Sequence, residues 1–406
     1  MNIIYIDHYA GSLQMGMEFR PYYMAREWLK EGHKVRVIAA DHSHLRSTTP
    51  PVTKELDSYT EDGIEYRFIK TIPYGSNGVK RMLNTLQFTA KLYLYAKKII
   101  SDFKPDLVIS SSTYPLDTYG AQRIARLSGA KYIHEGHDLW PLTLTTLMGM
   151  SKLNPFIMML AHAEKSAYKN ADFVVSVLAY SYKHMLNHGL RSKELFRCIP
   201  NGIVLEDWED PSPLPEEHAA VFDSLKEQNK KIVCYLGGHM VSNKLDTLID
   251  AALKMEDPSV AFVLVGKGAE KERLMAKAGD AKNIFFLPPV SKKAVPSVLY
   301  QADFLYVGAE KCSLYEYGVS MNKVYDYMMA SKPIIYGVEA ANNDVADADC
   351  GKTVASGDPD SIIKAIEEFG KMSPEELDAM GQRGKKAVLE KYNYKVLARD
   401  FLDLIK

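Results

Sequence analysis

Cysteine is scarce in this sequence and never occurs in close pairs. Only Cys198, Cys234, Cys312 and Cys350 occur among the 406 residues. Their spacing matches neither a zinc-binding pattern nor a disulfide framework. Free thiols persist in a reducing compartment, so we expect a cytoplasmic protein whose cysteines hold neither zinc nor disulfides.

Long apolar runs and an excess of one charge are missing as well. No stretch approaches the roughly 18 apolar residues of a transmembrane helix. The N-terminus, MNIIYIDHYAG, has no basic segment before an apolar one, which is typical of a core strand and not of a signal peptide. Fifty Lys+Arg against 51 Asp+Glu give a formal net charge of −1. That balance argues against nucleic acid as a partner.

Two α/β domains fit both the length and the pattern of the chain. At about 100–200 residues per domain, 406 residues predict two. Short apolar runs alternate with segments of helical spacing in both halves, which predicts doubly wound parallel sheets covered by helices. The expected strands are Asn2–Asp7, Val35–Ala40, Asp106–Ser112, Lys131–Glu135, Ala171–Val177, Phe196–Pro200, Ile232–Leu236, Ala261–Val265, Ile284–Leu287, Asp303–Val307 and Pro333–Val338.

The acidic, proline-containing segment Leu205–Pro215 separates the two halves and is typical of a linker. In such sheets a ligand binds beyond the carboxyl ends of the strands, and the crevice between two such domains is the expected site. The loops that follow strands in both halves are therefore the candidate functional segments.

Two of these loops lie in the first half. Ala10–Glu18 contains Gly11 and Gly16, which allow close backbone approach, and the following helix start offers N–H groups to an anion. A plain connecting loop is an equal alternative. Ile133–Pro141 (IHEGHDLWP) places His137 and Asp138 at a strand end. A metal site is not expected there, and a structural histidine remains the alternative to a functional one.

A third loop, Tyr235–Lys244 (YLGGHMVSNK), ends a strand in a glycine pair and begins a helix at Lys244. The glycines permit backbone contact with a ligand, and a lysine supplies a compact charge for phosphate. An ordinary solvated lysine in a first helical turn is the alternative.

The segment Tyr315–Pro333 (YEYGVSMNKVYDYMMASKP) predicts a helix that begins near Asn322, with Ser320 as its N-cap. Lys323 then opposes the helix dipole, which makes sense if an anion such as a diphosphate binds at that helix start. Asp326, one turn further, can accept hydrogen bonds from sugar hydroxyls. The alternative is a surface pair between Lys323 and Asp326.

Together and in this order, the motifs resemble the GT-B glycosyltransferases of family 4. Within the family, the chain is similar to bacterial enzymes that build surface polysaccharides, the fucosamine-transferase-like branch. The segment YGVSMNKVYDYMMASKPII carries the most specific resemblance. The other matching segments are FRPYYMAREWLKEGHKVRVIAA, IHEGHDLWP, IPNGI, YLGGHMVSNKLDTLIDAA and LVGKGAEKERL.

This resemblance implies two Rossmann-like domains that face each other across a cleft. Residues 1–204 would bind the acceptor and residues 205–388 the nucleotide sugar, while a C-terminal helix over 389–406 would cross back onto the first domain. The implied catalytic residues are His137, Lys244 and Lys323. The implied donor-binding residues are Gly16, Gly238, His239, Lys244, Ser320, Asn322, Lys323 and Asp326.

Within that set, the resemblance implies a role for each part. Gly16 would lie against the donor phosphates or the transferred sugar, and His137 near the transferred sugar. Asp326 would hold the ribose hydroxyls. Three positions depart from the family pattern. His239 stands where an arginine is usual, and Gly318 and Asp326 replace a pair of glutamates eight positions apart. The branch named above has a Ser…Lys motif in place of the glutamates, and this chain has one in Ser320 and Lys323.

The implied activity is that of a retaining hexosyltransferase that needs neither a metal nor another cofactor. Its donor would be a nucleotide-diphosphate sugar, with UDP expected from the resemblance alone. Its acceptor would be a glycan or a polyprenyl-diphosphate-linked glycan of a capsule, O-antigen or exopolysaccharide. The segments Asn77–Lys98 and Leu144–Lys169 are apolar with scattered lysines. They suit either the cytoplasmic membrane face or ordinary packing on the sheet.

Two other functions remain as alternatives. A sugar-nucleotide 2-epimerase shares this fold, but it needs acid and base residues around the sugar. A catalytically inactive partner subunit would keep the fold without transfer, and the residues at Gly318 and His239 are compatible with it.

Overall fold

The computed structural model describes residues 1–75 and 78–406, which form two α/β units. Unit 1 is Met1–Pro200 with Tyr317–Ser320 and Tyr394–Lys406, and unit 2 is Asn201–Glu316 with Met321–Asn393. The chain therefore passes between the units four times. The domain boundaries predicted from the sequence lie after residues 204 and 388. The short segment Tyr317–Ser320, which belongs to unit 1, was not predicted.

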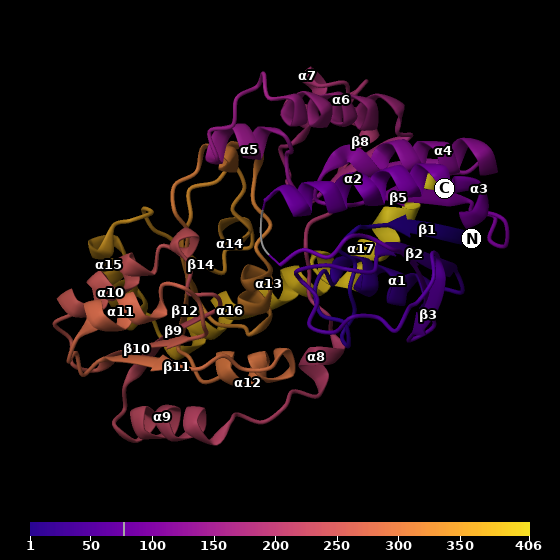
Figure 1. Cartoon of the computed structure of the whole chain (residues 1–406). Helices are drawn as coiled ribbons and strands as arrows, with labels where there is room; N and C mark the ends of the chain where they lie inside the picture. Colours follow the sequence, from indigo (N-terminus) through magenta and orange to yellow (C-terminus); the bar gives the residue numbers. More distant parts are fainter. Residues whose placement is uncertain (76–77) are drawn as a thin grey trace. The chain divides into compact units, whose positions relative to one another are not determined.

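Unit 1 is built on an eight-stranded sheet (Figure 1). All neighbouring strands are parallel except β3 and β4, which are antiparallel. The strands, in spatial order, are β3 (Asp57–Glu61), β4 (Ile64–Ile69), β2 (Lys34–Ala40), β1 (Asn2–Ile6), β5 (Leu107–Ser110), β6 (Lys131–Gly136), β7 (Phe173–Ser176) and β8 (Phe196–Cys198).

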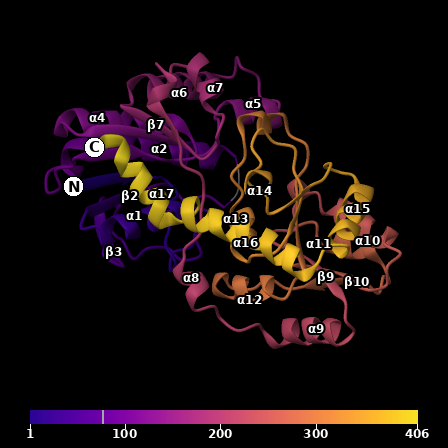
Figure 2. The ribbon, with the colours of Figure 1, turned by 180° about the vertical axis from the view of Figure 1, so that it is seen from behind.

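Helices cover both faces of this sheet, because its central strands are apolar on both sides. Trp28 of α1 (Arg20–Lys30) packs against Tyr5 of β1 and Phe401 of α17 (Tyr394–Leu402), with ring centroids 5.6 and 5.5 Å apart. Figure 2 shows α17 beside α1. The helices of unit 1 are α1 (Arg20–Lys30), α2 (Val79–Leu94), α3 (Ala96–Ile99), α4 (Thr118–Ser128), α5 (Leu142–Leu147), α6 (Pro155–Asn170), α7 (Tyr182–Asn187) and α17 (Tyr394–Leu402).

Unit 2 has a six-stranded, fully parallel sheet with a hydrophobic cluster on each face. The strands, in spatial order, are β11 (Ile284–Leu287), β10 (Val260–Val265), β9 (Lys231–Leu236), β12 (Phe304–Gly308), β13 (Ile334–Gly337) and β14 (Gly351–Thr353). The helices are α8 (Glu206–Glu209), α9 (Glu216–Glu227), α10 (Leu245–Lys254), α11 (Lys271–Ala278), α12 (Val295–Leu299), α13 (Asn322–Met329), α14 (Asp344–Asp347), α15 (Pro359–Gly370) and α16 (Pro374–Lys391).

These two sheets confirm the predicted fold class, two Rossmann-like α/β domains, and every predicted strand is present. Strand β14 and the β3–β4 hairpin are additional to the predicted strands. The hairpin turn is Asp62-Gly63, with φ values of 49° and 81°. Both residues have positive φ, as in a type I′ turn, and an Asp-Gly pair between two strand-like runs is the sequence signal that predicts one.

The C-terminal segment is not the single helix predicted over 389–406. Helix α16 ends at Lys391 and α17 begins at Tyr394. The buried side chain of Asn393 donates hydrogen bonds to the carbonyl oxygens of Val388 (3.0 Å) and Leu389 (2.9 Å). It thereby satisfies carbonyls that a helix end leaves open, and the chain turns there. None of the described helices has both the length and the apolar character needed to cross a bilayer.

Candidate functional site

Parallel strands β9 and β10 of unit 2 both continue into glycine loops at their carboxyl ends. A Cβ atom on Gly266 would lie 1.9 Å from the carbonyl oxygen of Gly237, and one on Gly268 would lie 2.1 Å from that of His239. Only glycine therefore lets the two loops touch. They border a cavity of about 310 Å³ lined by Leu236, Gly237, Gly238, Val265, Gly266, Lys267, Pro289 and Val290. Ligands of such sheets bind at this edge.

Lys323 in the first turn of α13 lies against the first of these loops. Its Nζ donates hydrogen bonds to the hydroxyl of Tyr235 (3.0 Å) and to Oδ1 of Asn243, and it lies 4.9 Å from the centroid of the Tyr235 ring. Tyr235 and Asn243 in turn donate to the carbonyl of Gly238, at 2.7 and 2.9 Å. No carboxylate of the described chain pairs with Lys323. Burial lowers the pKa of its ammonium to about 8.

Lys244 precedes α10 and has a left-handed backbone conformation, with φ at 48°. Its Nζ lies 3.1 Å from Oε1 of Glu310, and its side chain is 37% exposed. It follows directly after Asn243, the hydrogen-bond partner of Lys323. The segment Asn243-Lys244 therefore brings two ammonium groups together: Lys323 is hydrogen-bonded to Asn243, and Lys244 is the next residue. An anion that bound Lys244 would compete with Glu310 for its ammonium group.

His239 is fully buried beneath the glycine loops. Neither ring nitrogen has a hydrogen-bond partner among the described residues, and its N–H and C=O bind the carbonyl of Lys267 and the N–H of Glu270. Burial, with further repulsion from Lys271 and Lys323, lowers the pKa of the imidazole to about 4. The ring is therefore neutral near neutral pH, and the donor contact predicted for His239 stays a prediction.

Helix α13 begins at Asn322 as predicted, but Ser320 is not its N-cap. Met321 occupies that position without a side-chain cap, and Ser320 belongs to unit 1. The chain is extended at Met321, so Ser320 lies one residue too early to cap the first turn. Asn322 is exposed at the helix start.

Asp326, one turn along α13, does not form the alternative surface pair with Lys323. No side chain of the described residues forms a hydrogen bond or ion pair with it. Burial raises the pKa of Asp326 to about 7, with Lys292 opposing and Asp207 reinforcing the shift. This carboxyl group is available to a ligand hydroxyl.

His137 follows β6 in unit 1, where its ring is half-buried. Its Nε2 lies 2.7 Å from the hydroxyl of Ser111, at the end of β5, and 3.7 Å from Oε2 of Glu135. Burial lowers the pKa of His137, although Glu135 opposes the shift. His134, the other histidine of this segment, bonds instead to Ser110 through Nδ1 (2.9 Å). The two histidines therefore bond to different serines at the end of β5, His134 to Ser110 and His137 to Ser111.

Glu135 and Arg20 form a buried ion pair that the sequence analysis did not anticipate. Nε and Nη2 of Arg20 donate to Oε1 of Glu135 at 2.9 and 2.8 Å, and the other oxygen accepts from Tyr5 (2.5 Å) and Ser111 (2.6 Å). Despite burial, these partners lower the pKa of Glu135 to about 2, Arg20 most of all. The sequence does contain a signal for this pair. Glu135 is a charged residue within the apolar strand KYIHEG, and a buried charge requires a partner of opposite charge.

Gly16 lies in the loop that connects β1 to α1, with φ at 93°. A Cβ atom there would lie 2.8 Å from the backbone nitrogen of Ser47. The loop folds back on itself, since Ser12 and Gly16 exchange backbone hydrogen bonds of 3.0 and 2.8 Å. The glycine is therefore required by the backbone path, and its predicted donor contact stays a prediction.

Two sequence families match this chain, one in each half. Residues 15–207 match the family described as Glycosyltransferase Family 4, and residues 230–371 match Glycosyl transferases group 1. A curated relative from Escherichia coli K12, the putative colanic acid biosynthesis glycosyl transferase WcaI, is 26% identical over 291 residues. That alignment covers 68% of this chain and 69% of the relative.

Solved GT-B structures share the whole fold at low sequence identity. A sucrose-phosphate synthase from Thermosynechococcus elongatus aligns with a TM-score of 0.71 at 16% identity, over 100% of this chain and 98% of that one. The Anabaena protein Alr3699/HepE, solved in complex with UDP-glucose, aligns with a TM-score of 0.66 at 12% identity, over 100% and 99%. At these identities the likeness establishes the fold.

Replacing Glu135 with glutamine should destabilise the protein by about 3–5 kcal/mol, because Arg20 would then be buried without a counter-charge. In the wild type, the ionised Glu135 should contribute fully to the free energy of unfolding above pH 4.5, the ordinary carboxyl pKa. That contribution should be lost as the pH falls towards 2, the lowered pKa of Glu135. The free energy of unfolding in urea, followed by fluorescence at several pH values, measures both effects.

The matched control is Lys131→Ala, at a lysine on the same strand as Glu135. The change breaks an exposed pair with Asp172, the residue before β7, in which the side chains are 61% and 37% exposed. That change should cost less than about 1 kcal/mol. Equal losses in the two variants would contradict the structural role assigned to the buried pair.

Proposed function

Because the chain belongs to family 4 of the GT-B glycosyltransferases, we propose that it moves a sugar from a UDP-sugar to a hydroxyl of a glycan or lipid-linked glycan in bacterial surface-polysaccharide synthesis. One observation carries the donor assignment: Lys323 is a half-buried cation at a helix start with no carboxylate partner among the described residues, beside a cavity lined by glycine loops. A diphosphate fits these features, since backbone N–H groups, a helix start and a lysine all favour anions.

Support for UDP and for the pathway comes from relatives. Alr3699/HepE was solved with UDP-glucose, and WcaI is named for colanic acid biosynthesis. In our proposal Lys323, Asn322 and Ser320 hold the diphosphate, Lys244 approaches it in place of Glu310, and Asp326 accepts hydrogen bonds from the ribose. The raised pKa of Asp326 suits a carboxyl whose charge is stabilised when such hydroxyls arrive.

We further propose a retaining reaction without a metal ion. As the bond between sugar and phosphate breaks, negative charge grows on the leaving diphosphate, and Lys323 and Lys244 stabilise it as fixed cations. The acceptor hydroxyl attacks from the face of the leaving group and gives its proton to the departing phosphate. His137 lies near the transferred sugar in this scheme, with Ser111 and Glu135 fixing its ring.

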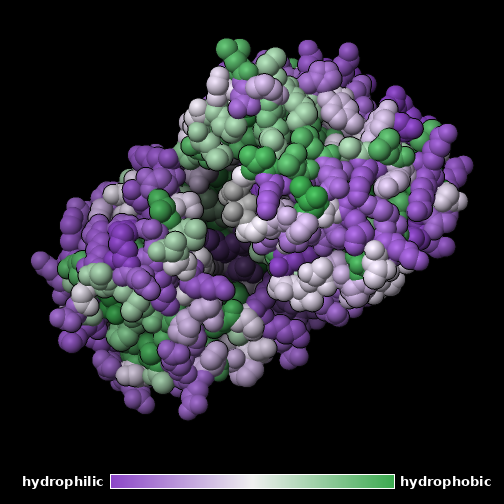
Figure 3. Space-filling view, in the orientation of Figure 1, coloured by the Kyte–Doolittle hydropathy of each residue, from purple (hydrophilic) through white to green (hydrophobic). Residues whose placement is uncertain are grey.

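Apolar side chains exposed around α5 and α6 support a membrane contact for unit 1. Leu147, Met148, Leu153 and Met158 are 58%, 69%, 83% and 57% exposed, and Lys152 and Lys165 are exposed among them. Figure 3 shows apolar surface over this part of the unit. We propose that it rests on the cytoplasmic membrane face, where a lipid-linked acceptor is found. Helix α2 carries the other predicted segment, whose first residue, Asn77, lies outside the described residues.

Substituting Lys323 with alanine should lower kcat/KM for transfer by about 10²- to 10³-fold, the cost of removing one fixed electrostatic contact to a transition state. Lys254→Ala, an exposed lysine of unit 2 paired with Asp360, is the matched control and should transfer normally. Steady-state kinetics with UDP-sugars and a glycan acceptor measure the effect, and circular dichroism checks the fold. Unchanged kcat/KM in Lys323→Ala would remove the diphosphate assignment.

Excess EDTA should leave the rate of transfer unchanged, since the proposed cations are side chains. The assay compares untreated, EDTA-treated and Mg²⁺-supplemented protein at a temperature well below its melting point. A strict requirement for a divalent ion would contradict the metal-independent mechanism and leave the family assignment intact.

Flotation with anionic liposomes tests the membrane contact. The wild-type protein should float with the vesicles, and the double variant Met148→Asp with Leu153→Asp should stay in the soluble fraction. Leu127→Asp, at a leucine of α4 that is 44% exposed, is the control and should float. Equal behaviour of the double variant and the wild type would exclude this surface.

A further inference from the structure

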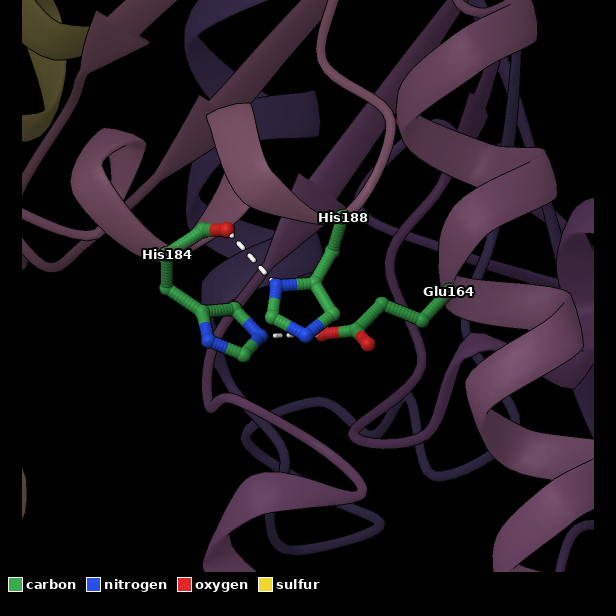
Figure 4. Close-up of side chains that lie close together, drawn as sticks. All are labelled: Glu164, His184 and His188. Carbon is green, nitrogen blue, oxygen red and sulfur yellow. Dashed lines mark hydrogen bonds and ion pairs between the residues drawn. The ribbon is translucent and has the colours of Figure 1, made fainter.

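Three metal-binding side chains meet on unit 1 (Figure 4). Glu164 projects from α6, His184 from α7, and His188 follows the end of α7. One ligand atom from each lies within 4.8 Å of the other two. Glu164 and His184 are buried, while His188 is exposed. None of the three takes part in the proposed transfer, so their arrangement calls for a separate explanation.

The two histidines are spaced as i and i+4 and lie with their rings stacked. The ring centroids are 3.9 Å apart at an interplanar angle of 17°. Nε2 of His184 lies 2.7 Å from Oε1 of Glu164, and that oxygen also accepts a hydrogen bond from Tyr168 (3.3 Å). Both histidines therefore present a nitrogen on the side where the carboxylate lies. Their rings would tilt out of the stacked arrangement for the two nitrogen lone pairs to converge on one ion.

The hydrogen bonds determine which nitrogen of His188 is available. Its Nδ1 lies 2.8 Å from the carbonyl oxygen of His184. A carbonyl only accepts, so Nδ1 carries the hydrogen and Nε2 keeps its lone pair. This is the arrangement in metal-binding histidines, where one ring nitrogen donates to the protein and the other binds the ion. A simple ion pair between Glu164 and His184 would not use Nε2 of His188.

We propose that Glu164, His184 and His188 form a zinc site with water in the fourth position. Two imidazoles and one carboxylate are one of the ligand sets that hold zinc through three protein side chains, and the exposed His188 provides the entry route. Zinc takes the lone pair of Nε2 in each ring and one carboxylate oxygen. The proton between His184 and Glu164 moves to Nδ1 of His184 or to solvent. The sequence predicts no metal, because these ligands are separated by 20 and 4 positions in no familiar motif.

The bound ion would join α6 to α7 and support a neighbouring segment. Tyr317 packs edge-on against His184, with centroids 5.8 Å apart, and its carbonyl accepts a hydrogen bond from the backbone of Tyr180 (2.9 Å). Zinc should therefore raise the melting temperature of the protein, whether or not the protein transfers sugar.

Calorimetric titration of tag-free, chelator-stripped protein with ZnCl₂ tests the site. We expect one equivalent to bind to the wild type and the melting temperature to rise. His188→Ala removes an exposed ligand beyond the helix and should weaken binding by at least the roughly 10-fold that even outer partners contribute. His162→Ala, an exposed histidine of α6 bonded to Tyr119, is the control and should bind zinc like the wild type.

Cobalt provides a second readout, because Co²⁺ in a tetrahedral site gives a visible absorption band. The band should appear in the wild type and in His162→Ala and be absent from His188→Ala. Failure of the wild type to bind zinc would overturn the proposal. So would unchanged zinc affinity in His188→Ala, or a loss confined to His162→Ala. Transfer assays play no part in these outcomes, so the zinc site and the transferase function can fail separately.

Discussion

An ammonium group held partly away from water is the interaction on which the proposed donor site depends. Lys323 lies in the first turn of α13, where the helix dipole disfavours a cation, and burial lowers its pKa to about 8. Tyr235 and Asn243 hold it by hydrogen bonds but bring no negative charge. Holding this charge partly buried without a counter-charge costs free energy, and the binding of an anion would offset that cost. The diphosphate proposed for the site would supply that counter-charge.

The segments that follow the strands are held in place differently in the two units. In unit 1, side chains determine the arrangement at the candidate site: Glu135 is held by Arg20 and Tyr5, and with Ser111 it orients His137. In unit 2, the backbone makes it, because loops that tolerate only glycine approach each other closely. Unit 1 therefore depends on a buried charge pair, whereas unit 2 depends on the absence of side chains, and substitutions should harm the two units for different reasons.

Sequence reasoning reached the fold because parallel strands buried on both faces appear as short apolar runs, and those runs do not depend on distant residues. It singled out Lys323 because a lysine at a helix start breaks a local rule, and Lys323 does lie in the first turn of α13, while its role stays a prediction. It did not reach Tyr235 or Asn243, which are 88 and 80 positions away from Lys323, nor the Arg20–Glu135 pair, 115 positions apart. Such partners are set by strand order, which the sequence does not display. Ser320 failed as an N-cap because its position relative to the first turn is a backbone detail.

The pH dependence of UDP binding tests the central claim most directly. Calorimetric titrations of UDP from about pH 6.5 to about pH 9.5 span the lowered pKa of Lys323, about 8. Affinity should fall as the pH rises through that value, because the ammonium loses its charge. The fall should vanish in Lys323→Arg, since arginine stays charged throughout this range. An affinity that does not change with pH, or an equal fall in Lys323→Arg, would contradict the assignment of the diphosphate to Lys323.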